Sequence, residues 1–528
     1  MLRRLVLTSA ASVVVTAGLA PVLVLIIQSV IAEYHTDFTY FRALFFSGRA
    51  WILAGHSLAL SSMTTLITLV VGVPLGVLLG KSDLPLRRLL LVVFVMPLVI
   101  PPYVLAVCWS NALSQDGTVA RWLTPEIASQ FSAWLFGLGG CILVLATTFL
   151  PIVVLITVAQ LSSVRTGYEE AARLVCGWPG VLWRVTLPLI APGIALAAVL
   201  VFLLSLGEFG VPIFLRVDVF PVESFAQFTA FYNFEAATAA ALPLGLVTFL
   251  LLLLERVFIR HRRYAPSGGP EPHTTIISLR SRTMPLLALI MTVALVVIVF
   301  PLGTLIGRGA SASALGVAVS RGGPSLGRSM AYAAAGATGL VLIGFLCGYT
   351  IQTRALRLWR SLDFLTIFLF ALPGPVIAIG LISLWNRKAT EFVYVTPIII
   401  ILGYLAQYTA LTTRMSTSAL DHIPRSMEEA AQMSGAHWGR RLLGIVMPLV
   451  RKGLAAAWLV GYLFCLRDTG ITMLVYPPGY DTLPVRTFTL MANGTPELIA
   501  ALCLLMIAAA VVPLVILAAT FRTAVRTT

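Results

Sequence analysis

The chain has 528 residues, of which 59% are hydrophobic and only 11% are charged. Soluble domains carry roughly 25% charged residues, so this composition excludes an ordinary soluble globule. The formal net charge is +15. Because the basic residues gather between apolar segments, they indicate orientation in a membrane and give no support to a nucleic-acid partner.

Apolar stretches long enough to cross a bilayer, roughly 18 to 20 residues each, recur along the whole chain. They lack the alternation of barrel strands, so they predict an all-α multi-pass membrane protein. The first stretch follows Arg3-Arg4 and is too long for a signal peptide, so we expect it to be retained as a span. We expect about twelve spans, at 5–31, 54–80, 89–112, 136–160, 188–208, 235–257, 284–306, 329–352, 362–385, 394–413, 448–468 and 497–520.

Basic residues in the loops predict the orientation of these spans. Most of the 36 Lys and Arg residues fall on one side if both termini are cytoplasmic. This side includes Lys81, Arg87 and Arg88, the stretch 256–263, Arg354, Arg357 and Arg360, and Arg440, Arg441, Arg451 and Lys452. We therefore expect both termini in the cytoplasm.

The chain reads as two similar halves. Residues 1–257 form a first domain of six predicted helices, 258–283 a Pro-, Gly- and Arg-containing cytoplasmic linker, and 284–528 a second domain of six helices. Met96-Pro97 corresponds to Leu372-Pro373, and both places carry further prolines that interrupt a span. An even number of spans in each half makes the repeat parallel, about an axis along the membrane normal.

One short cytoplasmic motif occurs in both halves. The segment at about 161–187 contains Glu169, Glu170, Ala171 and Ala172, and the segment at about 420–447 contains Glu428, Glu429, Ala430 and Ala431. These residues favour a short helix with acids in its first turn, where the helix dipole stabilises them. We expect Gly177 and Gly435 to end the two helices in the left-handed conformation, and Pro188 and Pro448 to open the next spans. One copy could be an ordinary connecting helix, but two matched copies favour a function.

Two acids also occupy matched positions. Glu208 and Asp468 lie late in the spans that follow the two segments, and about 20 residues at 1.5 Å each put them near the outer end of the bilayer. Charge within a span is costly and therefore a functional candidate. The acids are either structural caps or a cation-attracting pair along a substrate pathway; the sequence leaves both open.

The sequence offers no enzymatic site. The six cysteines show no paired spacing, and no cluster of His, Cys, Asp and Glu predicts a metal site or a resident cofactor. Gly80-Lys81-Ser82 resembles the end of a phosphate-binding loop. However, Gly76 and Gly80 are separated by one residue fewer than the motif requires. The segment also ends an apolar span rather than following a strand, so we reject that interpretation.

The pattern Glu-Ala-Ala, then Gly, then Leu-Pro resembles the membrane subunits of ATP-binding-cassette importers that depend on a binding protein. Two such domains fused in one chain look like the ferric-iron permeases and the related thiamine permeases, a type I importer fold. The first copy departs from the pattern, since Cys176 stands where the second copy has Gly435. Pro188 also arrives one residue early relative to Pro448. We therefore expect the two copies to differ in sensitivity to substitution.

The resemblance implies that both Glu-Ala-Ala segments are coupling helices that dock into two copies of a cytoplasmic ATPase, which binds ATP and Mg²⁺. A periplasmic or lipid-tethered binding protein would deliver the substrate, and the chain would lie in membrane lipid of the bacterial inner membrane without an ATPase site of its own. Ferric iron is the first expectation; thiamine, a polyamine or an aminophosphonate are alternatives. A secondary transporter driven by an ion gradient fits the spans but leaves the paired helices unexplained.

Overall fold

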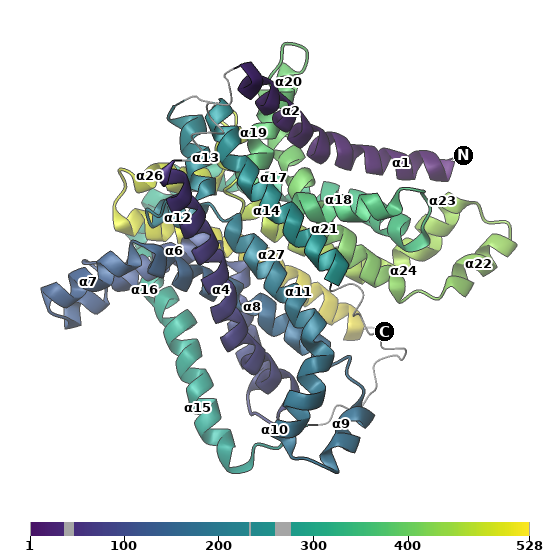
Figure 1. Ribbon diagram of the computed structural model, residues 1–528, viewed down its shortest axis with the longest axis horizontal. Coiled ribbons are helices and arrows are strands. Elements are labelled where there is room, and N and C mark those ends of the chain that lie inside the picture. Colours follow the sequence, from purple (N-terminus) through teal and green to yellow (C-terminus); the bar gives the residue numbers. More distant parts are fainter. Residues whose placement is uncertain (1, 36–46, 232–233, 259–275, 527–528) are drawn as a thin grey trace. The chain divides into compact units, whose positions relative to one another are not determined.

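The computed structural model describes residues 2–35, 47–231, 234–258 and 276–526. Within these ranges every regular element is a helix, and the single bridge joins Ser82 to Ile277. Ten of the helices are long and apolar enough to cross a membrane, or up to 12 if two bent pairs each count as one span. These spans fall on the twelve stretches predicted above, which confirms the all-α multi-pass class (Figure 1).

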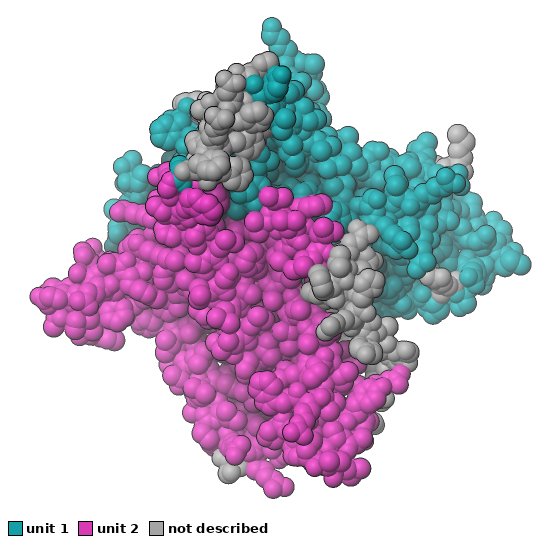
Figure 2. All heavy atoms as spheres, viewed as in Figure 1, with its two compact units in different colours: residues 1–47, 221–245, 312–528 teal, residues 48–220, 246–311 magenta. Residues whose placement is uncertain are grey.

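The helices form two compact units that differ from the two halves of the sequence. Unit 1 comprises residues 1–47, 221–245 and 312–528, and unit 2 comprises residues 48–220 and 246–311 (Figure 2). Each unit thus takes its opening helices from the other half of the chain. The division into 1–257, 258–283 and 284–528 therefore remains a prediction about the sequence repeat. The packing of the helices defines units with other boundaries.

Unit 1 is built around the long helix α17, which packs against α21, α24 and α27. The N-terminal helices α1 and α2 pack onto α17, α19 and α21, where Gly18 meets the side chain of Leu369 and Gly380 meets the backbone of Pro21. The elements are α1 (Leu2–Val14), η1 (Val15–Leu19), α2 (Ala20–His35), α13 (Phe220–Thr229), α17 (Ala312–Thr353), α18 (Trp359–Ala371), α19 (Gly374–Trp385), α20 (Glu391–Tyr394), α21 (Ile398–Asp421), α22 (Arg425–Met433), α23 (Trp438–Arg441), η7 (Leu442–Val446), α24 (Met447–Leu466), α25 (Thr472–Val475), α26 (Leu483–Met491) and α27 (Pro496–Arg526).

Unit 2 repeats this plan around α4, which packs against α8 and α11. Helices α15 and α16 occupy the place that α1 and α2 have in unit 1, and Ile290 and Ile298 are buried against Leu90 and Phe94. The elements are α4 (Gly48–Lys81), α5 (Arg87–Val99), α6 (Pro102–Leu113), η2 (Val119–Trp122), α7 (Pro125–Leu135), α8 (Leu138–Leu161), α9 (Thr166–Arg173), α10 (Trp178–Val181), η3 (Leu182–Thr186), α11 (Leu187–Leu206), α12 (Gly210–Phe214), η5 (Arg280–Arg282), α15 (Thr283–Ala294), η6 (Leu295–Val299) and α16 (Phe300–Gly309).

Two segments link these units along the chain. Helix α14 (Phe234–Phe258) crosses the division after Gly245. Most of the predicted linker, 259–275, lies outside the described residues. Its end is held in unit 2, where the Ile277 N–H donates to the Lys81 carbonyl at 2.8 Å and the Leu279 N–H donates to the Asp83 carboxylate at 3.0 Å.

The predicted spans 89–112 and 362–385 are not straight helices. Helices α5 and α6 meet at 104°, and α18 and α19 meet at 107°. Each break contains an extended residue followed by a proline, Ile100-Pro101 in unit 2 and Leu372-Pro373 in unit 1. A proline disfavours the helical conformation of the residue before it, which explains why both repeats bend at the same place.

A π turn precedes a proline at four matched places. The turns η1, η6, η3 and η7 each end two residues before a proline, namely Pro21, Pro301, Pro188 and Pro448. A π turn accommodates the missing N–H and the bulk of a proline ring within a continuing helix. The spans predicted to open at Pro188 and Pro448 therefore begin earlier, as continuous helical runs Trp178–Leu206 and Trp438–Leu466.

The span predicted at 329–352 is also longer than hydropathy indicated. Helix α17 has 42 residues, about 63 Å at 1.5 Å per residue, roughly twice the thickness of the hydrocarbon core. Its first part contains Arg321 and Arg328 and is too polar to be predicted as a span. It remains helical because it packs on α26 and α27, where Gly322 meets Leu483 and Leu502.

Candidate functional site

The two Glu-Ala-Ala segments fold alike. In unit 2 the order is α9, α10, η3 and α11, and in unit 1 it is α22, α23, η7 and α24 (Figure 1). One acid lies in the first turn of each helix, Glu169 in α9 and Glu428 in α22, and the second acid follows directly. Each unit thus carries a short helix that is followed by a turn and leads back into a long span.

The outer faces of α9 and α22 are open to solvent. Glu170 and Ala171 are exposed in unit 2, as are Glu429 and Ala430 in unit 1, while Ala172 and Ala431 are half-buried. Large apolar side chains beyond the alanines are also exposed: Leu174 and Val175 each at 89%, and Met433 at 88%. Exposed apolar groups next to acids and small residues indicate a surface that another protein covers.

The inner acid of α9 anchors it in unit 2. Glu169 is fully buried and forms an ion pair with Lys81, which is 4% exposed at the end of α4. The Thr186 hydroxyl also donates to Glu169 Oε1 at 2.7 Å. The lysine rejected above as a phosphate-loop residue therefore ties α9 to α4, while Thr186 ties it to η3.

The matching acid of α22 has a different partner. The Tyr349 hydroxyl donates to Glu428 Oε1 at 2.7 Å, and Trp438 Nε1 donates to the same hydroxyl oxygen at 3.3 Å. Arg441 Nη1 donates to Gln432 Oε1 at 2.5 Å, which ties α23 back to α22. This anchor contains one acid and neutral donors in place of an ion pair.

The register of the long helices explains the difference. Gly76 of α4 packs on Thr157, and Gly348 of α17 packs on Ser416 at the matching place of α21. Lys81 and Thr353 each lie five residues beyond these glycines, so Thr353 stands where unit 2 has its lysine. The cation in unit 1 comes from α1 instead, because Arg3 Nη2 donates to Thr353 Oγ1 at 3.4 Å and lies 5.8 Å from the centre of the Tyr349 ring.

The predicted role of the two glycines is right for one and wrong for the other. Gly435 has φ +79°, and the Ala436 N–H reaches the Ala431 carbonyl at 3.0 Å, so Gly435 ends α22 in the left-handed conformation as a Schellman motif. Gly177 has φ −73° and ψ 172° and instead precedes α10. The shorter first loop leaves no room for a left-handed residue, and α9 ends with the Cys176 N–H donating to the Ala172 carbonyl at 2.9 Å.

The acids Glu208 and Asp468 lie in different units and have different surroundings. Asp468 is 5% exposed and accepts hydrogen bonds from the Tyr408 hydroxyl at 2.8 Å, the Thr472 N–H at 2.9 Å and the Thr472 hydroxyl at 2.5 Å. Glu208 is half-buried and accepts the Gly210 N–H at 3.1 Å. The contacts of Asp468 favour the structural alternative for that residue, while Glu208 keeps the pathway role as a prediction.

A second motif occurs in both units, and its repetition was not recognised from the sequence. Asp481-Thr-Leu-Pro-Val follows α25, and Asp218-Val-Phe-Pro-Val follows α12. In unit 1 the Leu483 N–H donates to Ser329 Oγ at 2.7 Å; in unit 2 the Phe220 N–H donates to Ser57 Oγ at 3.1 Å. The repeat of Asp, an apolar residue, Pro and Val at matched places was the available signal.

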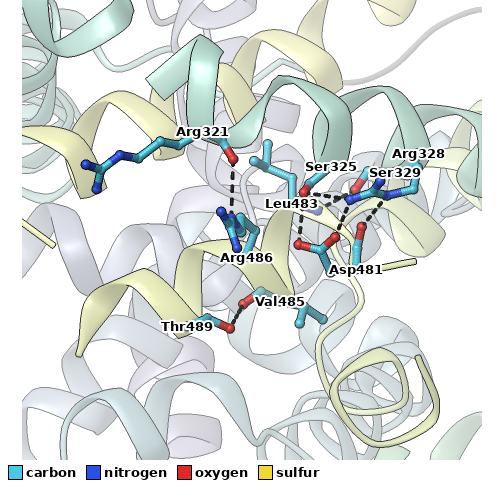
Figure 3. A network of polar contacts seen from close by, with 9 residues as sticks. All are labelled: Arg321, Ser325, Arg328, Ser329, Asp481, Leu483, Val485, Arg486 and Thr489. Carbon is cyan, nitrogen blue, oxygen red and sulfur yellow. Dashed lines mark hydrogen bonds and ion pairs between the residues drawn. The ribbon is translucent and has the colours of Figure 1, made fainter. Parts of the chain in front are cut away.

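The polar network around Asp481 shows how this motif is held in unit 1 (Figure 3). Arg328 pairs with the Asp481 carboxylate and its Nε donates to the Asp481 carbonyl at 3.0 Å. Ser325 donates to the same carboxylate at 3.0 Å. In unit 2 a histidine stands in the place of this arginine, and His56 Nδ1 lies 3.0 Å from the Asp218 carbonyl oxygen. Both networks fix the loop to the central long helix of its unit, α17 in unit 1 and α4 in unit 2.

These features define a class: a helical membrane protein with a duplicated plan and two matched short helices that carry the Glu-Ala-Ala motif. Two stretches, 72–264 and 340–527, match the family described as binding-protein-dependent transport system inner membrane component. The chain belongs to this family, which confirms the resemblance stated from the sequence.

Similar proteins include the ferric transport system permease protein of Actinobacillus pleuropneumoniae, 25% identical over 417 residues that cover 75% of this chain and 60% of that protein. A Haemophilus influenzae protein whose name also refers to ferric transport is 25% identical over 415 residues, 75% of this chain and 65% of its own. The molybdenum transport system permease protein of Mycobacterium tuberculosis is 32% identical over 207 residues, 37% of this chain and 75% of its own. The chain therefore spans 60% to 65% of the length of the two ferric relatives.

Proposed function

We propose that this chain is the membrane subunit of an ATP-driven importer in which α9 and α22 are the coupling helices. The observation that carries the proposal is the matched pair of short helices with exposed Glu170 and Glu429 and exposed apolar tips. Each helix would dock on one ATPase subunit of a pair. ATP and Mg²⁺ bind to those subunits, and closure of the pair moves the two helices and, through them, the spans.

A binding protein would deliver the substrate at the opposite face of the membrane. Support comes from the family, which is named for its dependence on such a protein. The basic residues at the ends of the spans support a cytoplasmic position for both termini and both coupling helices. The chain contributes the pathway and the docking surfaces, and a separate protein hydrolyses ATP.

Ferric iron is the substrate we propose first. The two relatives named for ferric transport align with 75% of the chain, across both halves. Those named for molybdenum transport align with 37% or 31%, and one named for 2-aminoethylphosphonate transport aligns with 32%. Thiamine and polyamines remain alternatives, because the binding protein sets much of the selectivity.

Charge reversal of the two outer acids tests this function. A Glu170→Lys and Glu429→Lys double variant should lose ATP-dependent uptake of ferric iron, or lose the co-purified ATPase, while the membrane subunit remains folded. Glu126→Lys is the matched control, since Glu126 is an exposed acid in the first turn of another helix of unit 2, α7. Normal uptake and assembly in the double variant would overturn the proposal.

A substrate panel separates the alternatives. Vesicles that hold the permease, its ATPase and the binding protein should accumulate ferric iron when supplied with ATP, and molybdate, 2-aminoethylphosphonate, thiamine or a polyamine should not replace it. Uptake driven by an ion gradient without ATP would instead identify a secondary transporter.

A further inference from the structure

Unit 1 contains an apolar groove beside the N-terminal helix. The groove has a volume of about 450 Å³ and runs between α1 with η1 and the segment that leads into α18. Ala11, Ser12 and Val15 line one wall, and Leu356, Leu358 and Leu362 line the other. It lies along helices that belong to candidate membrane spans.

The polar residues of α1 do not make this wall polar. The hydroxyls of Thr8, Ser12 and Thr16 donate to the carbonyls of Arg4, Thr8 and Ser12 within the same helix, at 2.8 Å, 2.9 Å and 2.9 Å. Each hydroxyl is therefore satisfied by its own helix, and methyl and methylene groups remain to meet an occupant. The groove suits a hydrocarbon chain.

The mouth of the groove is basic. Arg357 lines the groove itself, and Arg4 lies one helical turn before Thr8 on the same face of α1. Both arginine side chains are exposed. Trp359 lies close by with Arg354 and Arg360 over its ring, at 5.4 Å and 5.3 Å from the ring centre. Arginine and tryptophan together mark the boundary between lipid tails and headgroups.

The matching segment of unit 2 contacts α15 and the chain that precedes it. Leu84 and Leu90 of the matching segment are buried against Ile290 and Ala294 of α15. The chain before α15 pairs with Asp83, whose N–H donates to the Ile277 carbonyl at 3.2 Å.

We propose that this groove is a binding site for an anionic phospholipid. One acyl chain lies along Ala11, Ser12 and Leu362, and the headgroup phosphate lies between the guanidinium groups of Arg4 and Arg357. Basic pockets between membrane helices on the cytoplasmic side recognise anionic headgroups in this way. The site rests on the proposed function only in that α1 crosses the bilayer with its N-terminus on the cytoplasmic side.

Lipid competition on the purified permease tests the site directly. Native mass spectrometry would count phosphatidylglycerol and phosphatidylcholine retained by the protein after exposure to both in equal amounts. Each arginine should favour the anionic lipid about fivefold, so an Arg4→Gln and Arg357→Gln double variant should lose about 25-fold of that preference. Arg88→Gln is the matched control, an exposed arginine in the first turn of the corresponding helix α5.

A second variant tests the groove without changing charge. Ser12→Phe places a ring into the groove from an exposed position, so it should displace the retained lipid while the protein stays folded. Equal preference of the wild type for both lipids would overturn the proposal. So would a double arginine variant that behaves like Arg88→Gln, or full lipid retention by Ser12→Phe. None of these readouts depends on transport, so a failed importer proposal would be seen separately, in the uptake assay.

Discussion

The bases of the two Glu-Ala-Ala helices, α9 and α22, differ more than their exposed faces. Helix α9 is tied to unit 2 by the buried pair of Glu169 and Lys81, whereas α22 is tied to unit 1 by the Tyr349 hydroxyl on Glu428. Glu170 and Glu429, by contrast, are both exposed at the same place on the surface. The duplicated protein has thus kept the contact surface alike while the attachment beneath it has diverged.

The space behind the helices differs as well. Behind α22 lies a cavity of about 350 Å³ lined by Arg3, Glu428 and Arg441, among others. In unit 2, Lys81 and Thr186 both contact the buried Glu169; the matching residues in unit 1 are Thr353 and Val446. We therefore expect α22 to be the more readily displaced of the two helices.

The largest effect should come from breaking the buried ion pair. Lys81→Met leaves the Glu169 carboxylate buried without its cation, which should lower the free energy of unfolding by about 3 to 5 kcal/mol. Thermal unfolding of the purified permease measures the loss. Adding Glu169→Gln should recover most of it, because an amide can still accept from Thr186. Equal stability of wild type and Lys81→Met would show that the pair does not hold α9.

The next largest effect should be a difference in stability between variants of the two matched acids, Asp468 and Glu208. In Asp468→Asn one acceptor oxygen becomes a donor, so a Thr472 donor loses its partner at a cost of about 2 to 3 kcal/mol. Glu208→Gln keeps an oxygen for the Gly210 N–H and should cost less. If Glu208 attracts the cation, that variant should slow uptake without loss of stability. Similar melting temperatures for the two variants would contradict the structural role of Asp468.

The hydrogen bond from Tyr349 to Glu428 in unit 1 should contribute less to stability than the ion pair of Lys81 and Glu169 in unit 2. Tyr349→Phe removes one hydrogen bond to a carboxylate, about 2 kcal/mol, and Glu428 can be reached by water from the cavity beside it. We expect uptake to fall while the ATPase still co-purifies. Tyr332→Phe is a control on the same helix, α17. A Tyr349→Phe variant as unstable as Lys81→Met would remove the proposed difference between the anchors.

The smallest effect distinguishes the two glycines. Gly435→Ala forces a side chain into the left-handed conformation, a cost of about 1 to 2 kcal/mol, although a Cβ there would meet nothing within 4 Å. Gly177→Ala should be nearly neutral, since its φ is ordinary and its Cβ would lie 3.8 Å from Pro179 Cδ. Uptake at matched expression compares them, and equal losses would show that the irregular spacing of the first copy has no consequence.

Much of this molecule could be predicted from the sequence, because hydropathy and loop charge determine which segments enter a membrane. The two short Glu-Ala-Ala helices, α9 and α22, were located from composition and repetition alone. Hydropathy could not indicate the length of α17, since Arg321 and Arg328 make its first part polar. It also could not show that α1 packs with the second half, because apolar helices carry no local signal of their partners.

The anchors were missed for a different reason. Glu169 and Glu170 are adjacent and identical, and only the packing of α9 decides which of them is buried. Lys81 was considered as a nucleotide-binding residue and rejected, and no local pattern links it to an acid so far along the chain. The turn at Gly177 was wrong because a shorter loop demands a different backbone, which residue type alone does not reveal.

The exchange of opening helices has a consequence for synthesis. Helix α2 ends at His35, but the helices that receive it extend to Asp421 at the end of α21. At roughly 5 to 20 residues per second, the ribosome needs on the order of 20 to 80 s to make the intervening chain. For most of that interval Gly18 and Pro21 lack Leu369 and Gly380, the residues they finally meet. The first span, α1 with η1 and α2, must wait in the bilayer without these packing partners. Either half expressed without the other would supply helices whose packing partners are missing.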